Sequence, residues 1–192
     1  MDRDSKKLLV LSDTHGSVSA LSAVLSWAKE LMPPNDTICG AAFLGDGISD
    51  LHPAVVESGF CGDWIYVRGN NDYDHSIPDS AVFDFADHRF FLCHGHKYSL
   101  YGGCHTLAYA AKNNNADIVL FGHTHVPSIR TVDGIMLINP GSIGRPRNKL
   151  GASFAILECP PANSAAFAAN TQLITTFWGI GPKGQIKEIF LQ

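Results

Sequence analysis

The sequence lacks any long apolar segment. No stretch approaches the roughly 18 uninterrupted apolar residues that a membrane-spanning helix needs, and the N-terminal stretch MDRDSKKLLVLSD holds only a four-residue apolar run. That run is too short for the apolar region of a secretory signal peptide. We therefore expect neither a membrane span nor a signal peptide.

Basic runs and cysteine pairs are missing as well. The 192 residues include 14 lysines and arginines against 18 aspartates and glutamates, which gives a formal net charge of −4. Because a nucleic-acid-binding surface normally shows a basic stripe, nothing here supports a DNA- or RNA-binding module. The five cysteines form no C-x-x-C pair. We therefore expect reduced, partly buried thiols, which are typical of a cytoplasmic protein.

The first two-thirds of the chain alternates short apolar runs with amphipathic stretches. This alternation predicts an α/β fold built on a largely parallel sheet. Helices are expected at about 18–31, 48–58 and 104–114. Strands are expected at 7–11, 41–45, 64–69 and 117–122, with a hairpin over 81–93.

The last third changes character. Asp133 and Gly134 separate two strand-like runs, which is a strong hairpin signal. We predict that the following strands form a second sheet packed against the first, so that residues 1–192 make a single domain, a two-sheet β-sandwich flanked by helices. The expected segments are strands at 152–159, 172–180 and 184–192, with a surface loop at 160–170.

Five apolar runs end in the same way, at residues that can bind a metal ion. The motifs are SDTHG, LGDG, RGNND, LCHGH and FGHTH. Because ligands in open α/β sheets gather at the carboxyl ends of strands, we expect these tips to converge on one crevice. The candidate ligands are Asp13, His15, Asp46, Asn70, His94, His123 and His125, with His96 beside them.

The residue types indicate the metal and the chemistry. Imidazole and carboxylate ligands together suit manganese, iron and zinc. Residues i and i+2 of an extended segment point the same way, so Asp13 and His15 can reach one ion. Two carboxylates, Asp13 and Asp46, leave a pair of divalent cations with net positive charge, which the neutral amide of Asn70 preserves. Such a site attracts a phosphate and stabilises its charge during displacement.

The motif order D-x-H, G-D, G-N-x-D, H-G-H, G-H-x-H resembles the calcineurin-like metallophosphoesterase superfamily. The short chain and the segment NPGSIGRPR at 139–147 resemble its small bacterial and archaeal phosphodiesterase branch. The resemblance implies a four-layer sandwich with the active site at the carboxyl ends of the strands. It also implies two divalent ions, with manganese favoured and iron, zinc, nickel, cobalt or magnesium as alternatives.

The resemblance also implies roles for the ligands. Asp13, His15 and His125 would hold one ion. Asn70, His94 and His123 would hold the other, and Asp46 would bridge both. A hydroxide between the ions would attack phosphorus in line with the leaving group. The predicted catalytic residues are Asp46, Asn70, Asp72, His94 and His96.

One motif departs from the family pattern. Many members have histidine after the motif asparagine, but this chain has Asn71, which cannot act as a general acid. We expect weaker action on poor leaving groups unless His96 or an arginine compensates. Asp72 is expected to orient a neighbouring group through a hydrogen bond.

Structural roles compete with these interpretations. Ser12 and Asp13 would also suit the start of a helix as capping residues, and the NPGS segment is fully explained as a rigid turn. Arg145 and Arg147 either contact a phosphate or are solvated loop residues.

The favoured function is therefore a dinuclear phosphodiesterase acting on small phosphodiesters. The alternatives are a phosphomonoesterase using the same site and a non-catalytic scaffold that resembles a retromer subunit. The complete ligand set favours the enzyme. The apolar C-terminal strands offer a surface for a homo-oligomer.

Overall fold

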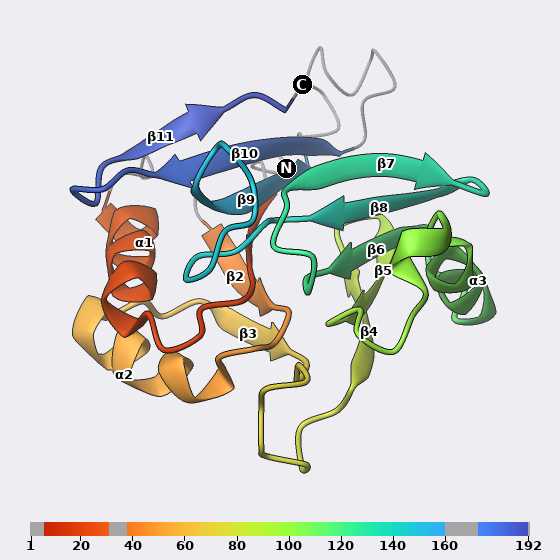
Figure 1. Cartoon of the computed structure of the whole chain (residues 1–192), viewed down its shortest axis with the longest axis horizontal. Coiled ribbons are helices and arrows are strands. Elements are labelled where there is room, and N and C mark those ends of the chain that lie inside the picture. The colour runs from red at the N-terminus through yellow and green to blue at the C-terminus, as the bar shows by residue number, and fades with distance from the viewer. Residues whose placement is uncertain (1–5, 31–37, 160–172, 192) are drawn as a thin grey trace, which may run out of the picture.

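The computed structural model describes residues 6–30, 38–159 and 173–191. Two mixed sheets pack face to face, and helices cover their outer faces (Figure 1). The predicted two-sheet sandwich flanked by helices is therefore confirmed. The loop predicted at 160–170 lies outside the described residues.

The first sheet has six strands in the order β11-β10-β9-β1-β2-β3. Its β1, β2 and β3 run parallel, whereas β9, β10 and β11 add to the β1 side in antiparallel fashion. The strands are β1 (Lys6–Leu11), β2 (Ile38–Phe43), β3 (Asp63–Tyr66), β9 (Ala152–Cys159), β10 (Ile174–Ile180) and β11 (Ile186–Ile189).

The second sheet has five strands in the order β4-β5-β6-β8-β7. Its β5, β6 and β8 are parallel, and β4 and β7 are antiparallel edge strands. Hairpins join β4 to β5 and β7 to β8, as the sequence predicts. The strands are β4 (Ser80–Phe85), β5 (His88–Cys93), β6 (Ile118–Phe121), β7 (Ser128–Val132) and β8 (Ile135–Asn139).

The predicted division of strands between the sheets was wrong. The last three strands do not form a second sheet with the hairpin at Asp133. They extend the first sheet, where β9 pairs with β1 through Leu8 and Leu157, while the second sheet begins in the middle of the chain at β4. The physical reason is that β1 has a fully buried run from Leu8 to Leu11. Such a central strand needs a backbone partner on each side.

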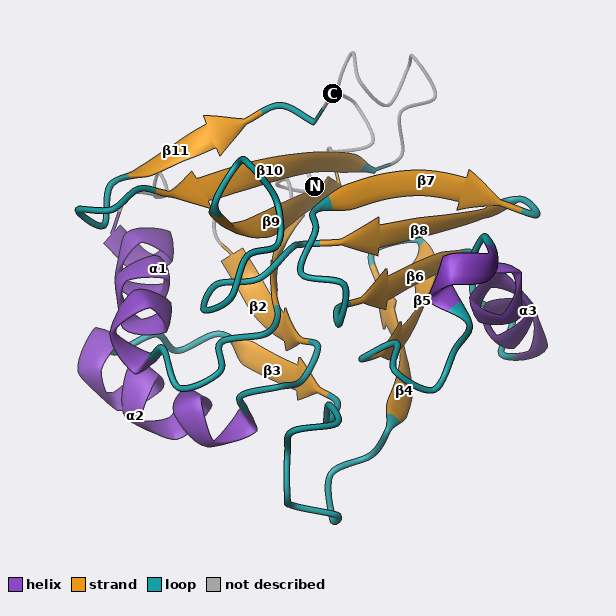
Figure 2. Ribbon diagram, viewed as in Figure 1, coloured by secondary structure: helices purple, strands orange, loops and turns teal. Residues whose placement is uncertain are grey.

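Helices complete four layers (Figure 2). The apolar faces of α1 (Val18–Glu30) and α2 (Ile48–Ser58) pack on the first sheet, while α3 (His105–Asn113) and the short helix η1 (Leu100–Gly102) pack on the second. A third cluster fills the space between the sheets, where Val10 of β1 and Leu92 of β5 belong to one core. No helix among the described residues is long and apolar enough to cross a membrane.

This topology brings distant loops together. Strands β2 and β6 belong to different sheets, and their carboxyl ends point toward the middle of the molecule from opposite sides (Figure 1). The loops after β1, β2, β5 and β6 therefore meet at one place, which is where four of the five predicted motifs lie.

Candidate metal centre

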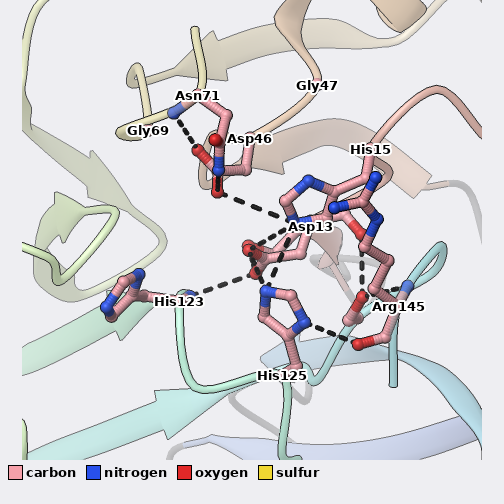
Figure 3. A network of polar contacts seen from close by, with 12 residues as sticks. Asp13, His15, Asp46, Gly47, Gly69, Asn71, His123, His125 and Arg145 are labelled. Carbon is pink, nitrogen blue, oxygen red and sulfur yellow. Dashed lines mark hydrogen bonds and ion pairs between the residues drawn. The ribbon is translucent and has the colours of Figure 1, made fainter. Parts of the chain in front are cut away.

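Four of the predicted ligands are buried side by side. The exposed fractions are 0 % for Asp13, 2 % for Asp46, 0 % for His94 and 3 % for His125. His15 joins them, with its Nε2 atom 3.8 Å from Asp13 Oδ1 and 3.7 Å from Asp46 Oδ2 (Figure 3). Buried carboxylates are costly unless they are paired or coordinate a cation, so this cluster needs bound positive charge.

The backbone at the ligands is strained. Asp13, His15, Asp46, His123 and His125 all have positive φ angles, at 56°, 45°, 59°, 66° and 60°. Residues other than glycine rarely adopt this conformation, and it persists only where the surrounding structure enforces it. Here each strand turns sharply at its end, so that the ligand side chain faces the other loops instead of continuing the sheet.

Two glycines allow the loops to approach the carboxylates. A Cβ atom on Gly69 would lie 2.1 Å from Asp46 Oδ1, and one on Gly122 would lie 2.7 Å from Asp13 Oδ2. Only glycine therefore fits at these points. The glycines of the RGNND and FGHTH motifs are thus required for a steric reason.

Two imidazoles are oriented by backbone carbonyls. His94 Nδ1 donates to the carbonyl of Leu44 at 2.7 Å, and His125 Nδ1 donates to that of Arg145 at 2.5 Å. In the neutral ring, Nε2 is then a bare acceptor. Backbone carbonyls orient metal-binding histidines in this way.

These bare acceptors face other acceptors. His125 Nε2 lies 3.1 Å from Asp13 Oδ1 and 3.3 Å from His15 Nε2, and His94 Nε2 lies 3.4 Å from Asp46 Oδ2. Neither Asp13 Oδ1 nor His94 Nε2 has a hydrogen-bond partner among the described residues. Only a proton or a metal cation placed between such atoms makes the arrangement favourable, so the donor set fits divalent ions.

The donor atoms form two overlapping groups. Asp13, His15 and His125 make one group, and Asp13, Asp46 and His94 make the other, with the ligand atoms of each within 4.8 Å of one another. Asp13 is shared by both. Asp46 Oδ2 also reaches both groups, because it lies 3.7 Å from His15 Nε2 and 3.4 Å from His94 Nε2.

Asn71 holds the Asp46 carboxylate in place. Its backbone N–H donates to Oδ1 at 2.7 Å, and its side-chain amide donates to Oδ2 at 2.5 Å (Figure 3). Asn71, which stands where many members of the family that the sequence resembles have histidine, therefore contacts a predicted ligand directly. The sequence offered no signal for this contact, because it depends on how the tight turn at 69–72 is rotated.

Burial and charge shift the pKa values at the site in opposite directions. Burial alone would raise the pKa of Asp46, but the neighbouring His94 ring and the hydrogen bonds from Asn71 outweigh it and hold that pKa well below its usual range. Burial opposes the protonation of His94, yet Asp46 and Asp13 raise its pKa. Burial dominates at His15, His96 and His123 and lowers the pKa of each.

The Asp72 carboxylate accepts hydrogen bonds from backbone N–H groups and does not bond the side chains of the predicted ligands within the described residues. Its Oδ2 accepts the N–H groups of Asp46 and Gly69, both at 2.7 Å, and its Oδ1 accepts those of Gly47 and Ile48, both at 2.9 Å. One carboxylate thus joins the loop after β2 to the loop after β3, at the start of α2. This geometry supports the orienting role expected for Asp72.

Three predicted site residues lie at the margin of the buried ligand cluster. Asn70 is exposed, and no hydrogen bond or ion pair joins it to the other ligands in the described part of the chain. The backbone N–H of His123 donates to Asp13 Oδ2 at 3.1 Å, but its ring points away from Asp13 (Figure 3) and lies 5.1 Å from the His94 ring, centroid to centroid. The His96 ring lies 5.4 Å from that of His94.

Several important residues were not predicted. Buried Asn139 donates to the carbonyl of Gly122 at 2.7 Å and accepts from the N–H of Gly141 at 2.9 Å. Ser142 donates to the carbonyl of Asp13 at 2.8 Å. The NPGS segment is therefore more than a rigid turn, because it positions two ligand loops. Asn139 also ends an apolar strand, the same signal that identified the ligands.

A further unpredicted carboxylate fixes the first ligand loop. Asp50 Oδ2 accepts the hydroxyl of Thr14 at 2.5 Å and the N–H of Gly16 at 2.8 Å. The alternative in which Asp13 caps the first helix is not observed. Within the described residues, Asp13 Oδ2 instead accepts from the Ser12 hydroxyl and from the N–H of His123.

Known proteins share both the sequence pattern and the fold. Residues 7–161 match the calcineurin-like phosphoesterase superfamily domain. The chain is 29 % identical over 152 residues to the probable metallophosphoesterase YsnB of Bacillus subtilis, covering 78 % of this chain and 82 % of that protein. It is 35 % identical over 152 residues to the phosphodiesterase MJ0936 of Methanocaldococcus jannaschii, covering 70 % and 82 %.

A solved structure supports the same conclusion for the fold. Vps29 of Entamoeba histolytica, complexed with Zn²⁺, is similar with a TM-score of 0.67 and 20 % identity, over 95 % of this chain and 97 % of that one. With the family match over most of the chain, the predictions of a metallophosphoesterase fold and of a hydrolase family are confirmed. The chain belongs to the calcineurin-like phosphoesterase superfamily.

Proposed function

We propose that the chain is a dinuclear metal-dependent phosphodiesterase that acts on small phosphodiesters. The observation that carries the proposal is the pair of overlapping donor groups, which share Asp13 and are both within reach of Asp46. A centre of this kind has room for two cations joined by a carboxylate. The relative named as a phosphodiesterase supports the choice of reaction.

The residues divide between two ions. Asp13, His15 and His125 would hold the first, and His94, His123 and Asn70 would hold the second, with Asp46 between them. Asn70 has the least support, because it is exposed and no hydrogen bond or ion pair joins it to the centre among the described residues. When bound, the two ions would acidify water and neutralise phosphate charge, which is the chemistry needed for in-line hydrolysis. Manganese is the favoured metal.

The protein itself contributes orientation. The carbonyls of Leu44 and Arg145 aim His94 and His125, Asn71 holds the Asp46 carboxylate, and Asp72 fixes the loop that carries it. Because these contacts hold the donors before any ion arrives, little reorganisation accompanies binding. His96 lies beside His94 and is the candidate proton donor for poor leaving groups.

Two alternatives remain to be separated by experiment. A phosphomonoesterase would use the same centre. A non-catalytic interaction scaffold is supported by the similarity to Vps29 in fold, but the intact donor set argues for the enzyme.

We also propose a single domain in the cytoplasm. The core shared by both sheets supports the single domain, and the buried thiols of Cys93 and Cys104, which form no disulfide, support the cytoplasm.

The test is hydrolysis of a chromogenic phosphodiester and its monoester by metal-stripped protein with Mn²⁺ added back. The proposal expects diester hydrolysis that requires both Mn²⁺ and Asp46, so that Asp46→Ala is inactive. A faster monoester would favour the phosphatase. Loss of all activity with manganese, nickel, cobalt and zinc would favour the scaffold.

A further inference from the structure

Arg145 has a backbone fixed against the metal centre. Its N–H donates to the Ser142 hydroxyl at 2.8 Å, and its carbonyl accepts from His125 Nδ1 at 2.5 Å. Ser142 in turn donates to the carbonyl of Asp13. The position of Arg145 is therefore coupled to a predicted ligand on each side.

The segment before Arg145 packs tightly on the first ligand loop. The N–H groups of Ile143 and Gly144 donate to the carbonyls of Ser12 and Asp13 at 3.2 and 3.0 Å. A Cβ atom on Gly144 would lie 1.9 Å from the carbonyl oxygen of Thr14. The backbone that carries Arg145 therefore has little freedom to move relative to the centre.

The side chain of Arg145 lies over the same centre. Its guanidinium group is beside His15 in Figure 3. Its positive charge acts on that ring, where it adds to burial in lowering the pKa of His15 against the pull of Asp46 and Asp13. Arg145 is exposed, and its side chain has no hydrogen bond or ion pair with any described residue. A guanidinium beside a buried carboxylate cluster, with its donors open to solvent, is available to bind an anion.

We propose that Arg145 binds an unesterified oxygen of the substrate phosphate, an inference that rests on the proposed function. The planar fork of arginine matches two oxygens of a phosphate, and such charge-assisted hydrogen bonds are stronger than neutral ones. Arg145 then acts as a substrate-binding residue that holds the phosphate over the metal centre. The other loop candidate, Arg147, is not among the charges that act on the His15 ring.

The test compares three variants of the Mn²⁺-loaded protein. Arg145→Met removes the charge and the fork, and Arg145→Lys keeps only the charge. Lys149→Met is the matched control, because Lys149 is an exposed cation in the same loop. Two quantities are measured: KM and kcat for a chromogenic phosphodiester, and the Kd of inorganic phosphate by calorimetry.

The proposal expects Arg145→Met to raise both KM and the phosphate Kd by roughly 10- to 100-fold, with kcat changed much less. Arg145→Lys should recover part of this loss, and Lys149→Met should stay within about twofold of the parent. Mn²⁺ stoichiometry should be the same in all four proteins, since Arg145 is not a ligand.

Equal values for Arg145→Met and Lys149→Met would overturn the proposal. So would loss of Mn²⁺ binding in Arg145→Met, because it would make the residue structural. If the parent protein hydrolyses no phosphodiester, the proposed function fails. The phosphate titration then still decides whether Arg145 binds the anion.

Discussion

His94 Nε2 lies 3.4 Å from Asp46 Oδ2, although His94 follows a strand of the second sheet and Asp46 a strand of the first. The other ring nitrogen of His94 is committed to the carbonyl of Leu44, two residues before Asp46. The same loop thus supplies both the group that orients the histidine and the carboxylate that faces it. This coupling across the two sheets makes the centre depend on the packing of the whole sandwich.

Asp72→Asn should destabilise the protein by about 2–4 kcal/mol, as measured by urea unfolding. The carboxylate accepts four backbone N–H groups. An amide retains one acceptor oxygen and turns an NH₂ group toward the remaining donors. Asp74→Asn is the control, because Asp74 is exposed and its carboxylate accepts hydrogen bonds from the nearby Ser76. Similar costs for the two variants would show that the backbone contacts of Asp72 matter little.

Gly69→Ala should weaken Mn²⁺ binding by at least about tenfold. The added Cβ atom would lie 2.1 Å from Asp46 Oδ1, so the carboxylate would have to move. Gly102→Ala is the matched control. Neither glycine has a positive φ, and the Gly102 Cβ would meet nothing closer than Ser99 Oγ at 3.4 Å. Calorimetric titration of both variants checks this, and unchanged affinity in Gly69→Ala would refute the steric account.

Asn139→Ala should cost about 2–4 kcal/mol of stability and also weaken metal binding. The substitution removes the side-chain donor to the carbonyl of Gly122, takes the Oδ1 acceptor from the N–H of Gly141, and frees the loop that carries His123. Asn114→Ala serves as the comparison, since the Asn114 amide makes an exposed bond to the carbonyl of Ala110. A loss of stability with normal Mn²⁺ affinity would contradict the positioning role of Asn139.

Asp79 should make a small, pH-dependent contribution to stability. Its hydrogen bond from Lys97 and the charge of Arg68, 2.8 Å away, lower its pKa. A carboxyl group with a lowered folded pKa stabilises the fold above its unfolded pKa and loses that contribution as the pH falls through the folded pKa. The Tm difference between the parent and Asp79→Asn should therefore be largest near pH 7 and become smaller below about pH 4. Because these groups are partly exposed, we expect at most about 1 kcal/mol. A difference that grows in acid would contradict this assignment.

Local elements of the fold could be predicted from the sequence, but the pairing of strands could not. The helices begin and end within a residue or two of the expected positions, because periodicity and turn residues are local signals. The partner of β1 is set by contacts with β9, more than a hundred residues away. Nothing in the sequence of Ala152–Cys159 distinguishes a strand beside β1 from one in a separate sheet.

The candidate site shows the same difference between local signals, which the sequence carries, and long-range contacts, which it does not. Strand-ending polar residues identified Asp13, Asp46, His94 and His125, which the structure brings together. The positions of side chains in the turn at 69–72 depend on backbone rotation, so the sequence could not foresee that Asn71 contacts Asp46 while Asn70 is exposed. The residues that support the ligands act through hydrogen bonds to loops far away in the sequence, and such contacts leave no local pattern.

Calorimetric titration of the metal-stripped protein with Mn²⁺ tests the central claim, a centre for two ions joined by Asp46, most directly. The account predicts two ions per chain for the parent protein. It predicts at most one tightly bound ion for Asp46→Asn, which keeps the size of the side chain but loses its charge. A parent protein that binds one ion or none, or an Asp46→Asn variant that binds two with unchanged affinity, would contradict it.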